Sequence, residues 1–211
     1  MKIAVIAANG RTGKAFVEQA LRAGHAVVAG VYSTNTLSDH ANLTVQTCDA
    51  RDEDDVTRLI KDCDAVASFI GHVKESPVNV QTDAMKVLVS AMNAQGITRL
   101  VSLTGTGVRF PGDKITMIDR ILNLSIGLID PARVNDGKKH VAFLQQSSLD
   151  WTIIRVLKLQ NTKPKPFSLQ QYGPTKLYVS RDEVAVACLQ VLEQGSFIHQ
   201  APIISSPSAH L

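Results

Sequence analysis

Apolar residues gather in short continuous runs along the chain, and the stretches between the runs carry apolar residues at every third or fourth position. Continuous runs are typical of strands buried on both faces of a parallel sheet, whereas the wider spacing is typical of helices with one buried face. Seven runs are predicted to be strands: 2–8, 26–32, 43–49, 64–71, 99–105, 151–157 and 197–205.

Helix signals fill the intervals between the strands. The first helix should end at Gly24, because glycine commonly terminates helices. Ser76 and Pro77 have the residue types of an N-cap followed by a first helical position, so a long helix is expected from there to Gly96. Helical spacing also covers 56–63, 114–126, 133–148 and 180–192.

The region 158–179 breaks this alternation. It has no clear period and holds three prolines within 159–176, so a loop-rich excursion is expected, ending where Ser180 and Glu183 have capping-box spacing. Elsewhere strand and helix alternate at least six times. With right-handed crossovers this predicts an α/β, doubly wound, mostly parallel sheet with helices on both faces, in a single domain over 1–211.

Composition narrows the function classes. The hydrophobic content of 45% supports a substantial core, and the net charge of +3 is spread along the chain without a stretch of five or more like charges. Nucleic-acid and membrane partners are therefore not expected, and a small charged ligand remains open. Three cysteines without CxxC spacing should be buried, reduced thiols. The opening apolar run is too short for a signal peptide, so we expect a cytoplasmic protein.

The loop after the first strand, "AANGRTGK" at residues 7–14, is the candidate ligand site. In doubly wound sheets a pyrophosphate binds at this turn, because free N–H groups and the dipole of the next helix favour an anion. Gly10 and Gly13 keep the three-residue spacing that allows close backbone approach and helix packing, while Ala7 occupies the position of the first glycine. An ordinary strand-to-helix turn is the alternative.

The loop resembles the GATGxTG motif of the NmrA-like group of atypical short-chain dehydrogenase/reductases, which includes biliverdin-IXβ reductase and NAD(P)H-dependent flavin reductases. "SSLDWTIIR" at 147–155 and "SRDEVA" at 180–185 resemble two later motifs of that group. Ala7, Asn9 and Val156 depart from it. The resemblance implies a Rossmann fold and a dinucleotide site, whose implied contacts are Asn9, Gly10, Arg11, Thr12 and Gly13 for the pyrophosphate, Asp49 and Ala50 for adenine, and Gly71 and His72 for the ribose and nicotinamide.

The choice between NAD and NADP is usually set at the end of the second strand. There the chain has Tyr32, Ser33 and Thr34, with no carboxylate to hold a ribose hydroxyl and no cation for a 2′-phosphate. Tyr32 could stack on adenine. Arg11 could supply the missing cation, so NADP is favoured over NAD; a solvated loop arginine is the alternative.

Candidate catalytic groups are few. Tyr172 and Lys176 have the Tyr-x-x-x-Lys spacing of ordinary short-chain dehydrogenases, but Gly173-Pro174 between them argues against the helix that aligns such a pair. The resemblance points instead to Thr104, Thr106 and Lys138 near the cofactor. The acidic stretch 49–55 fits a first helical turn, since carboxylates favour the positive helix end, and no metal site is expected.

Three functions remain open. The first is an NAD(P)H-dependent reductase passing hydride to a flavin such as FMN, a quinone or a similar conjugated acceptor, held by stacking, with 105–114 and 158–179 covering it. The second is a non-catalytic NmrA-like dinucleotide sensor that regulates a partner. A third is a protein that binds another phosphate ligand, such as FMN alone. The oligomeric state is open.

Overall fold

The strands and helices alternate as predicted along most of the chain. The computed structural model describes residues 1–73, 75–114 and 116–207. The strands are β1 (Lys2–Ile6), β2 (Ala26–Val31), β3 (Leu43–Thr47), β4 (Ala65–Ser68), β5 (Arg99–Gly105), β6 (Asp150–Val156), β7 (Lys158–Gln160), β8 (Ser168–Gln170), β9 (Tyr178–Ser180) and β10 (Ile203–Ser205). The helices are α1 (Arg11–Arg22), α2 (Glu53–Ile60), α3 (Val80–Gln95), α4 (Met117–Ile129), α5 (Pro131–Gln145) and α6 (Arg181–Glu193).

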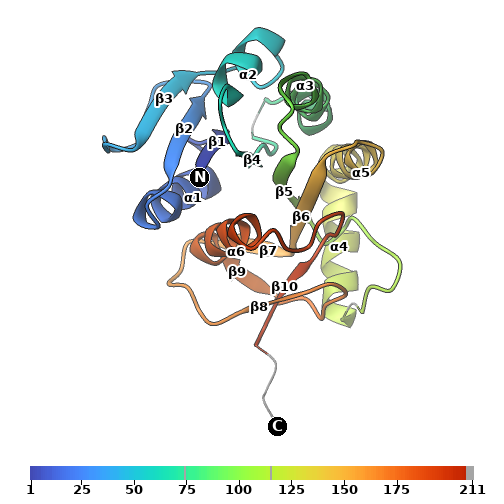
Figure 1. The fold of residues 1–211 in the computed structure, drawn as a ribbon. Coiled ribbons are helices and arrows are strands. Elements are labelled where there is room, and N and C mark those ends of the chain that lie inside the picture. Colours follow the sequence, from blue (N-terminus) through green and yellow to red (C-terminus); the bar gives the residue numbers. More distant parts are fainter. Residues whose placement is uncertain (74, 115, 208–211) are drawn as a thin grey trace.

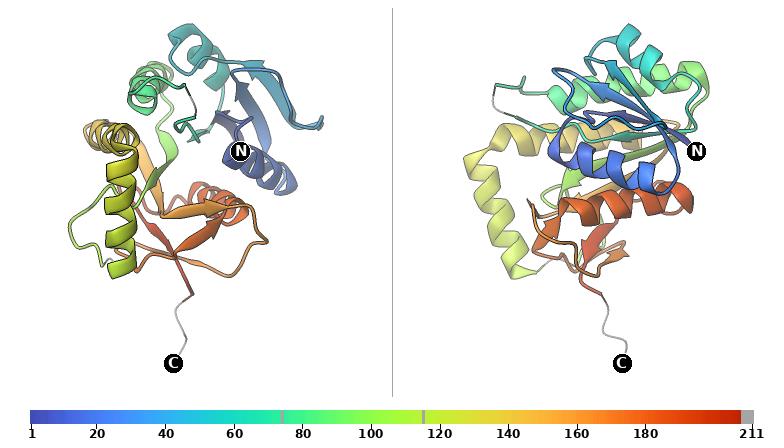
Figure 2. Two further views of the ribbon diagram at one scale, coloured as in Figure 1. Left: turned by 180° about the vertical axis from the view of Figure 1, so that it is seen from behind. Right: turned by 90° about the vertical axis from the view of Figure 1, so that its left-hand side faces the viewer.

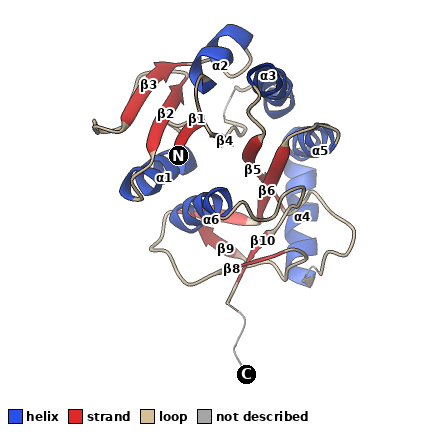
Figure 3. Cartoon of the chain, in the orientation of Figure 1, coloured by secondary structure: helices blue, strands red, loops and turns tan. Residues whose placement is uncertain are grey.

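The central sheet has eight strands in the order β3-β2-β1-β4-β5-β6-β10-β8 (Figures 1 and 3). The strands from β3 to β10 are parallel, and β8 pairs antiparallel with β10. The strand order reverses between β1 and β4. This arrangement confirms the predicted doubly wound fold, in which ligands bind at the carboxyl ends of the strands near the reversal.

Helices cover both faces of the sheet (Figure 2). The buried side chains of α1 and α6 form one core cluster with one face of the strands, including Phe16, Val184 and Val191. Those of α2, α3 and α5 form a second cluster on the other face, including Leu88 and Leu144. The inner strands β1 and β4 are apolar on both sides because both of their faces are covered.

Helix α3 begins later than predicted. Its N-cap is Asn79, whose side chain makes no capping hydrogen bond, so the Ser76-Pro77 start is wrong. The cap comes instead from α5, where the Asp136 carboxylate accepts hydrogen bonds from the backbone N–H groups of Gln81 (2.8 Å) and Thr82 (3.0 Å). Asp136, more than fifty residues further along the chain, thus caps the helix in place of Ser76, the N-cap that the local sequence predicted.

Two other boundaries differ. The predicted helix 114–126, which includes Ile115 outside the described residues, is α4 at Met117–Ile129, and α5 follows after a single residue. That residue, Asp130, caps α5 by accepting from the Arg133 N–H. The predicted strand 197–205 shrinks to β10, because Phe197 and His199 have left-handed backbone (φ 56° and 55°), which interrupts an extended chain.

The excursion 158–179 is more ordered than the absence of a period indicated. It contains β7 and β8 and leads into β9, which pairs with β7 in a small second sheet. The buried Glu183 carboxylate holds it to α6 by accepting from the Lys165 N–H and from Lys176 Nζ, both at 2.7 Å. Ser180 caps α6 as predicted, by accepting from the Glu183 N–H.

The three cysteines are buried and unpaired, as predicted. Burial raises the pKa of the Cys63 thiol to about 11, so the thiol form predominates near neutral pH. Among the helices described, none is both long and apolar enough to cross a membrane.

Candidate functional site

The turn between β1 and α1 has the geometry that close approach of a ligand to backbone requires. Ala7 takes the left-handed conformation (φ 58°) that the first glycine of the related motif would adopt without strain. A Cβ on Gly13 would lie 2.4 Å from the Ala7 carbonyl oxygen and 2.9 Å from the Ala8 Cα, so only glycine fits. The turn is therefore kept despite the substitution, with strain at Ala7.

The first turn of α1 is free to bind an anion. Its N-cap, Gly10, has no side chain that could accept from the helix N–H groups. The N–H groups of Arg11, Thr12 and Gly13 have no partner within the helix because the first turn lacks a preceding carbonyl. The predicted phosphate-binding residues thus lie together at the positive end of the α1 dipole.

Asn9 has a role that its sequence position did not reveal. Its Nδ2 donates to the Thr34 carbonyl (2.8 Å), and its Oδ1 accepts from the Thr36 N–H (3.1 Å). The side chain therefore joins the turn after β1 to the loop after β2, and a contact of Asn9 with the pyrophosphate stays a prediction.

The ends of β2 and β3 meet beside this turn. Tyr32, 71% exposed, and Ser33 follow β2 without a carboxylate, while Asp49 and the half-buried Ala50 follow β3. Arg51, which sequence reasoning missed, donates to Asp49 through Nε (3.1 Å) and Nη2 (2.7 Å). These hydrogen bonds lower the pKa of Asp49 and raise that of Arg51. The segment that carries both residues begins beside the end of β2, because Thr47 pairs with Val31 and the Cys48 N–H donates to the Val31 carbonyl (3.0 Å).

Gly71 and His72 follow β4 at the same edge of the sheet. Gly71 is exposed, with open space where a Cβ would lie. The His72 imidazole is nearly buried, and its Nε2 lies 2.8 Å from Asp136 Oδ2. Burial raises the pKa of Asp136, but hydrogen bonds from Thr82, Gln81 and His72 outweigh burial and keep it below its usual value. An ionised Asp136 thus fixes His72 and the start of α3.

The three candidate catalytic residues do not converge. Thr106 is fully buried and its hydroxyl accepts from Asn123 Nδ2 (3.1 Å), while Thr104 is 6% exposed and its hydroxyl packs against Gly137 of α5. Lys138 is exposed on α5. The neighbouring residues of this helix that are buried are Asp136, Gly137 and His140. A catalytic role for the three therefore stays a prediction.

A groove of about 420 Å³ lies beside the start of α1, between α1, residues 161–164 and the start of α6. Four cationic side chains line it, and we call it the cationic groove: Arg11, Lys14, Lys163 and Arg181. Arg11 therefore lies on the α6 side of the turn, with residues 161–164, and does not share this groove with Tyr32 or Ser33. Lys163 and Arg181 were not foreseen from sequence.

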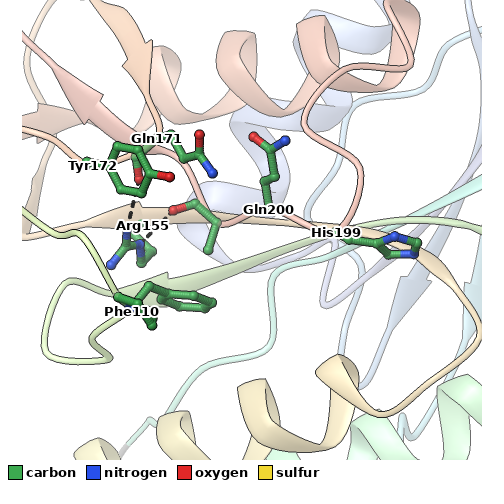
Figure 4. A pocket seen from close by; sticks show the side chains of 8 residues that line it. Phe110, Arg155, Gln171, Tyr172, His199 and Gln200 are labelled. Atoms are coloured by element: carbon green, nitrogen blue, oxygen red, sulfur yellow. Dashed lines mark hydrogen bonds between the residues drawn. The ribbon is translucent and has the colours of Figure 1, made fainter.

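A second cavity, of about 180 Å³, surrounds Arg155 (Figure 4). Arg155 is fully buried and bidentate with Asp113 (2.6 and 2.7 Å), lies 4.7 Å from the Phe110 ring centroid, and donates through Nε to the Ala201 carbonyl. Its charge is thus already balanced, and the arrangement ties the loop after β5 to β6 and the segment before β10.

Tyr172 and Lys176 do not form a catalytic dyad, as expected. Tyr172 packs against Gly112 and lines the cavity at Arg155, whereas Lys176 is bound to Glu183, and the segment between them is not helical. The acidic stretch 49–55 serves as predicted in a first helical turn, with Asp52 capping α2. Within the described residues no cluster of three His, Cys, Asp or Glu side chains could hold a metal.

Comparison with known proteins bears on this site. A family model described as NAD(P)H-binding matches residues 7–195, nearly the whole chain and starting at the turn after β1. The uncharacterized protein YwnB of Bacillus subtilis is 26% identical over 204 residues, with 92% of each chain covered. The uncharacterized chloroplastic protein At2g34460 of Arabidopsis thaliana is 29% identical over 213 residues, covering 93% of this chain and 74% of that protein.

Solved structures support the fold. A short-chain dehydrogenase/reductase from Veillonella parvula, in complex with NADP, has a TM-score of 0.82 at 17% identity, covering 100% of this chain and 96% of that one. A proposed NADH-flavin reductase from Streptococcus pneumoniae has a TM-score of 0.76 at 23% identity, covering 97% and 98%. Together with the free first turn of α1 and the close approach at Gly13, the family match shows that the chain belongs to the NAD(P)H-binding family and binds a nicotinamide dinucleotide.

Proposed function

We propose that the protein is an NAD(P)H-dependent reductase that passes hydride to a flavin, a quinone or a similar conjugated small molecule. The observation that carries the proposal is the α1 start: an uncapped helix end, a glycine with no room for a Cβ, and a cationic groove directly beside them. The similar fold of a proposed NADH-flavin reductase adds support for the acceptor class.

The chain's own residues would hold the cofactor in a defined order. The N–H groups of the first α1 turn and Arg11 would neutralise the pyrophosphate, Asp49 and Ala50 would contact adenine, and Gly71 with His72 would border the nicotinamide. When bound, the reduced nicotinamide supplies a hydride. The protein's part would be to hold donor and acceptor in contact, since conjugated acceptors take hydride readily without a tuned acid. The reduced acceptor would then take its proton from solvent.

We further propose that NADPH is preferred over NADH, with Arg51 as the cation that favours it. The β2 end lacks a carboxylate that would repel a 2′-phosphate. Arg51 is exposed and lies four residues after Thr47, which pairs with Val31 at the end of β2, while Arg11 lines the cationic groove. This replaces the expectation that Arg11 selects the cofactor.

We propose a compartment and a class of partner from the cysteines and the net charge. Three buried, unpaired thiols suit a reducing compartment, so we place the protein in the cytoplasm. The partner would be a small-molecule acceptor, since a net charge of +3 spread along the sequence does not favour nucleic acid or a membrane surface.

The test is steady-state oxidation of NADPH and NADH, followed by the loss of reduced-nicotinamide absorbance, with FMN, riboflavin and quinones as acceptors. Turnover with at least one of them is expected. Binding of NADPH in a thermal-shift assay without turnover on the whole panel would refute the reductase and favour the sensor. A ligand at one hundred times its Kd should add about 2.7 kcal/mol of stability, so binding is readily detected.

A further inference from the structure

The cationic groove holds positive charge that the protein itself leaves unbalanced. Arg11 and Lys14 come from α1, Lys163 from the loop after β7, and Arg181 from the first turn of α6. Among the described residues, none forms an ion pair with any of these four. Two carboxylates also line the groove, but Glu18 is paired with Arg22, which leaves Asp182 against four cations.

The cations in the groove also repel one another. Burial lowers the pKa of the Arg181 guanidinium, and the positive charge of Arg11 lowers it further. Arg181 donates to Asn161 Oδ1, a neutral acceptor, so its position is fixed without its charge being neutralised. Bringing like charges together costs free energy that an anion between them would recover.

We propose that the Lys163–Arg181 side of the cationic groove binds an anionic group, a phosphate or carboxylate, carried by the hydride acceptor. This rests on the proposed reductase function and names the acceptor class: a conjugated ring with an acidic tail. Arg11 and Lys14 belong to the helix that begins at the cofactor turn, whereas Lys163 and Arg181 belong to the excursion and to α6. The groove therefore joins the start of the cofactor helix to the excursion that we expect to cover the acceptor.

Cofactor and acceptor can both carry the phosphate that such cations bind, and the experiment separates these two sources. FMN and riboflavin have the same ring and differ by the terminal phosphate. With saturating NADPH, the KM for FMN should be about fivefold or more below that for riboflavin, as expected for pairing with partly exposed cations. Salt should raise the KM for FMN and leave that for riboflavin nearly unchanged.

The variants are Lys163→Gln and Arg181→Gln. Each should raise the KM for FMN about threefold to fivefold, bringing it toward the riboflavin value, while the KM for NADPH changes less than twofold. Lys165→Gln is the matched control, because Lys165 is an exposed lysine of the same segment that does not line the groove. Lys163 is exposed and has no ion-pair partner within the part of the chain that the structure describes, so its variant keeps the test valid if Arg181→Gln folds poorly.

Two results would overturn the proposal while leaving the reductase intact: equal KM values for FMN and riboflavin, or variants that raise the KM for NADPH but not for FMN, which would assign the groove to the cofactor pyrophosphate. If no acceptor is reduced, the proposed function fails separately. Calorimetry with FMN and riboflavin on the protein alone then decides the groove: tighter FMN binding that Lys163→Gln removes supports the anion site, and equal binding refutes it.

Discussion

A buried histidine should make the stability of this protein fall steeply in mild acid. His140 of α5 is 1% exposed, its Nε2 lies 3.0 Å from Ser102 Oγ, and its Nδ1 has no hydrogen-bond partner among the described residues. Burial lowers the pKa of His140 from 6.5 to about 4, against an opposing effect of Asp136. The native state therefore keeps this ring neutral where the unfolded chain would protonate it.

The size and sign of the effect follow from linkage. Below pH 6.5 the unfolded state binds a proton at His140 and the native state does not, so the free energy of unfolding decreases as pH falls from 6.5 to about 4. Below about pH 4 both states are protonated at His140, and this residue causes no further decrease. A shift of that size corresponds to about 3 kcal/mol. This is a large part of a typical stability of about 5–15 kcal/mol. The ion-paired carboxylates Asp49 and Asp113, with pKa values lowered from 3.8, lose their contribution mainly at lower pH.

Urea unfolding between pH 7 and pH 4.5, followed by the fluorescence of the buried Trp151, measures this directly. The wild type should lose about 2–3 kcal/mol over that range. His140→Gln, which can still bond to Ser102, should lose far less, whatever its stability at pH 7. His40→Gln, at an exposed histidine, should keep the wild-type slope. An unchanged slope in His140→Gln would show that another group controls the acid transition.

Three further predictions concern the cofactor turn and its neighbours. Gly13→Ala should weaken NADPH binding at least tenfold and destabilise the fold, because its Cβ would meet the Ala7 carbonyl at 2.4 Å. Gly127→Ala, within α4 and with open space around the Cβ, should leave NADPH binding unchanged in calorimetry and stabilise the protein in urea by up to about 1 kcal/mol. Ala7→Gly should stabilise the protein by about 1 kcal/mol in urea, since it relieves left-handed strain; no gain would refute that strain. Arg51→Gln should reduce the NADPH over NADH preference about fivefold or more, while Arg11→Gln should weaken both cofactors alike. The opposite pattern in Kd values would restore Arg11 as the selecting cation.

The fold was predictable because its signals are local. A strand buried on both faces must be apolar throughout, which is why β1, β4 and β6 stand out as runs. The failures occurred where a distant residue replaced a local signal. Asp136 of α5 caps α3. The left-handed backbone of Phe197 and His199 shortens the last strand, and neither residue is a glycine, the residue type that would predict such a conformation.

In the candidate site, too, the residues of one continuous stretch were predictable and those from distant segments were not. Gly10 and Gly13 could be found because the turn that needs them is a continuous stretch of chain. The charges around it could not, since Arg51 follows β3 whereas the position that usually selects the cofactor follows β2, and Lys163 and Arg181 come from different segments that line one groove. The proposed choices of cofactor and acceptor both rest on charges that the fold, and not the local sequence, brings together.

Arg11 shows what this means for the chemistry. From sequence alone it was the cation nearest the position that selects NADP, because it lies within the phosphate turn. In the fold, Arg11 is the first residue of α1, and the direction of this helix places its side chain in the groove between α1 and α6. We therefore propose that Arg11 serves the pyrophosphate common to both cofactors and that Arg51 discriminates between them. Arg51 is exposed, and Asp49 is the only hydrogen-bond partner of its side chain among the residues described. Because Asp49 is also the proposed adenine contact, a bound 2′-phosphate would compete with Asp49 for Arg51 and free its carboxylate for the adenine amino group. Selection of the phosphate and recognition of the base would then be coupled through a single ion pair.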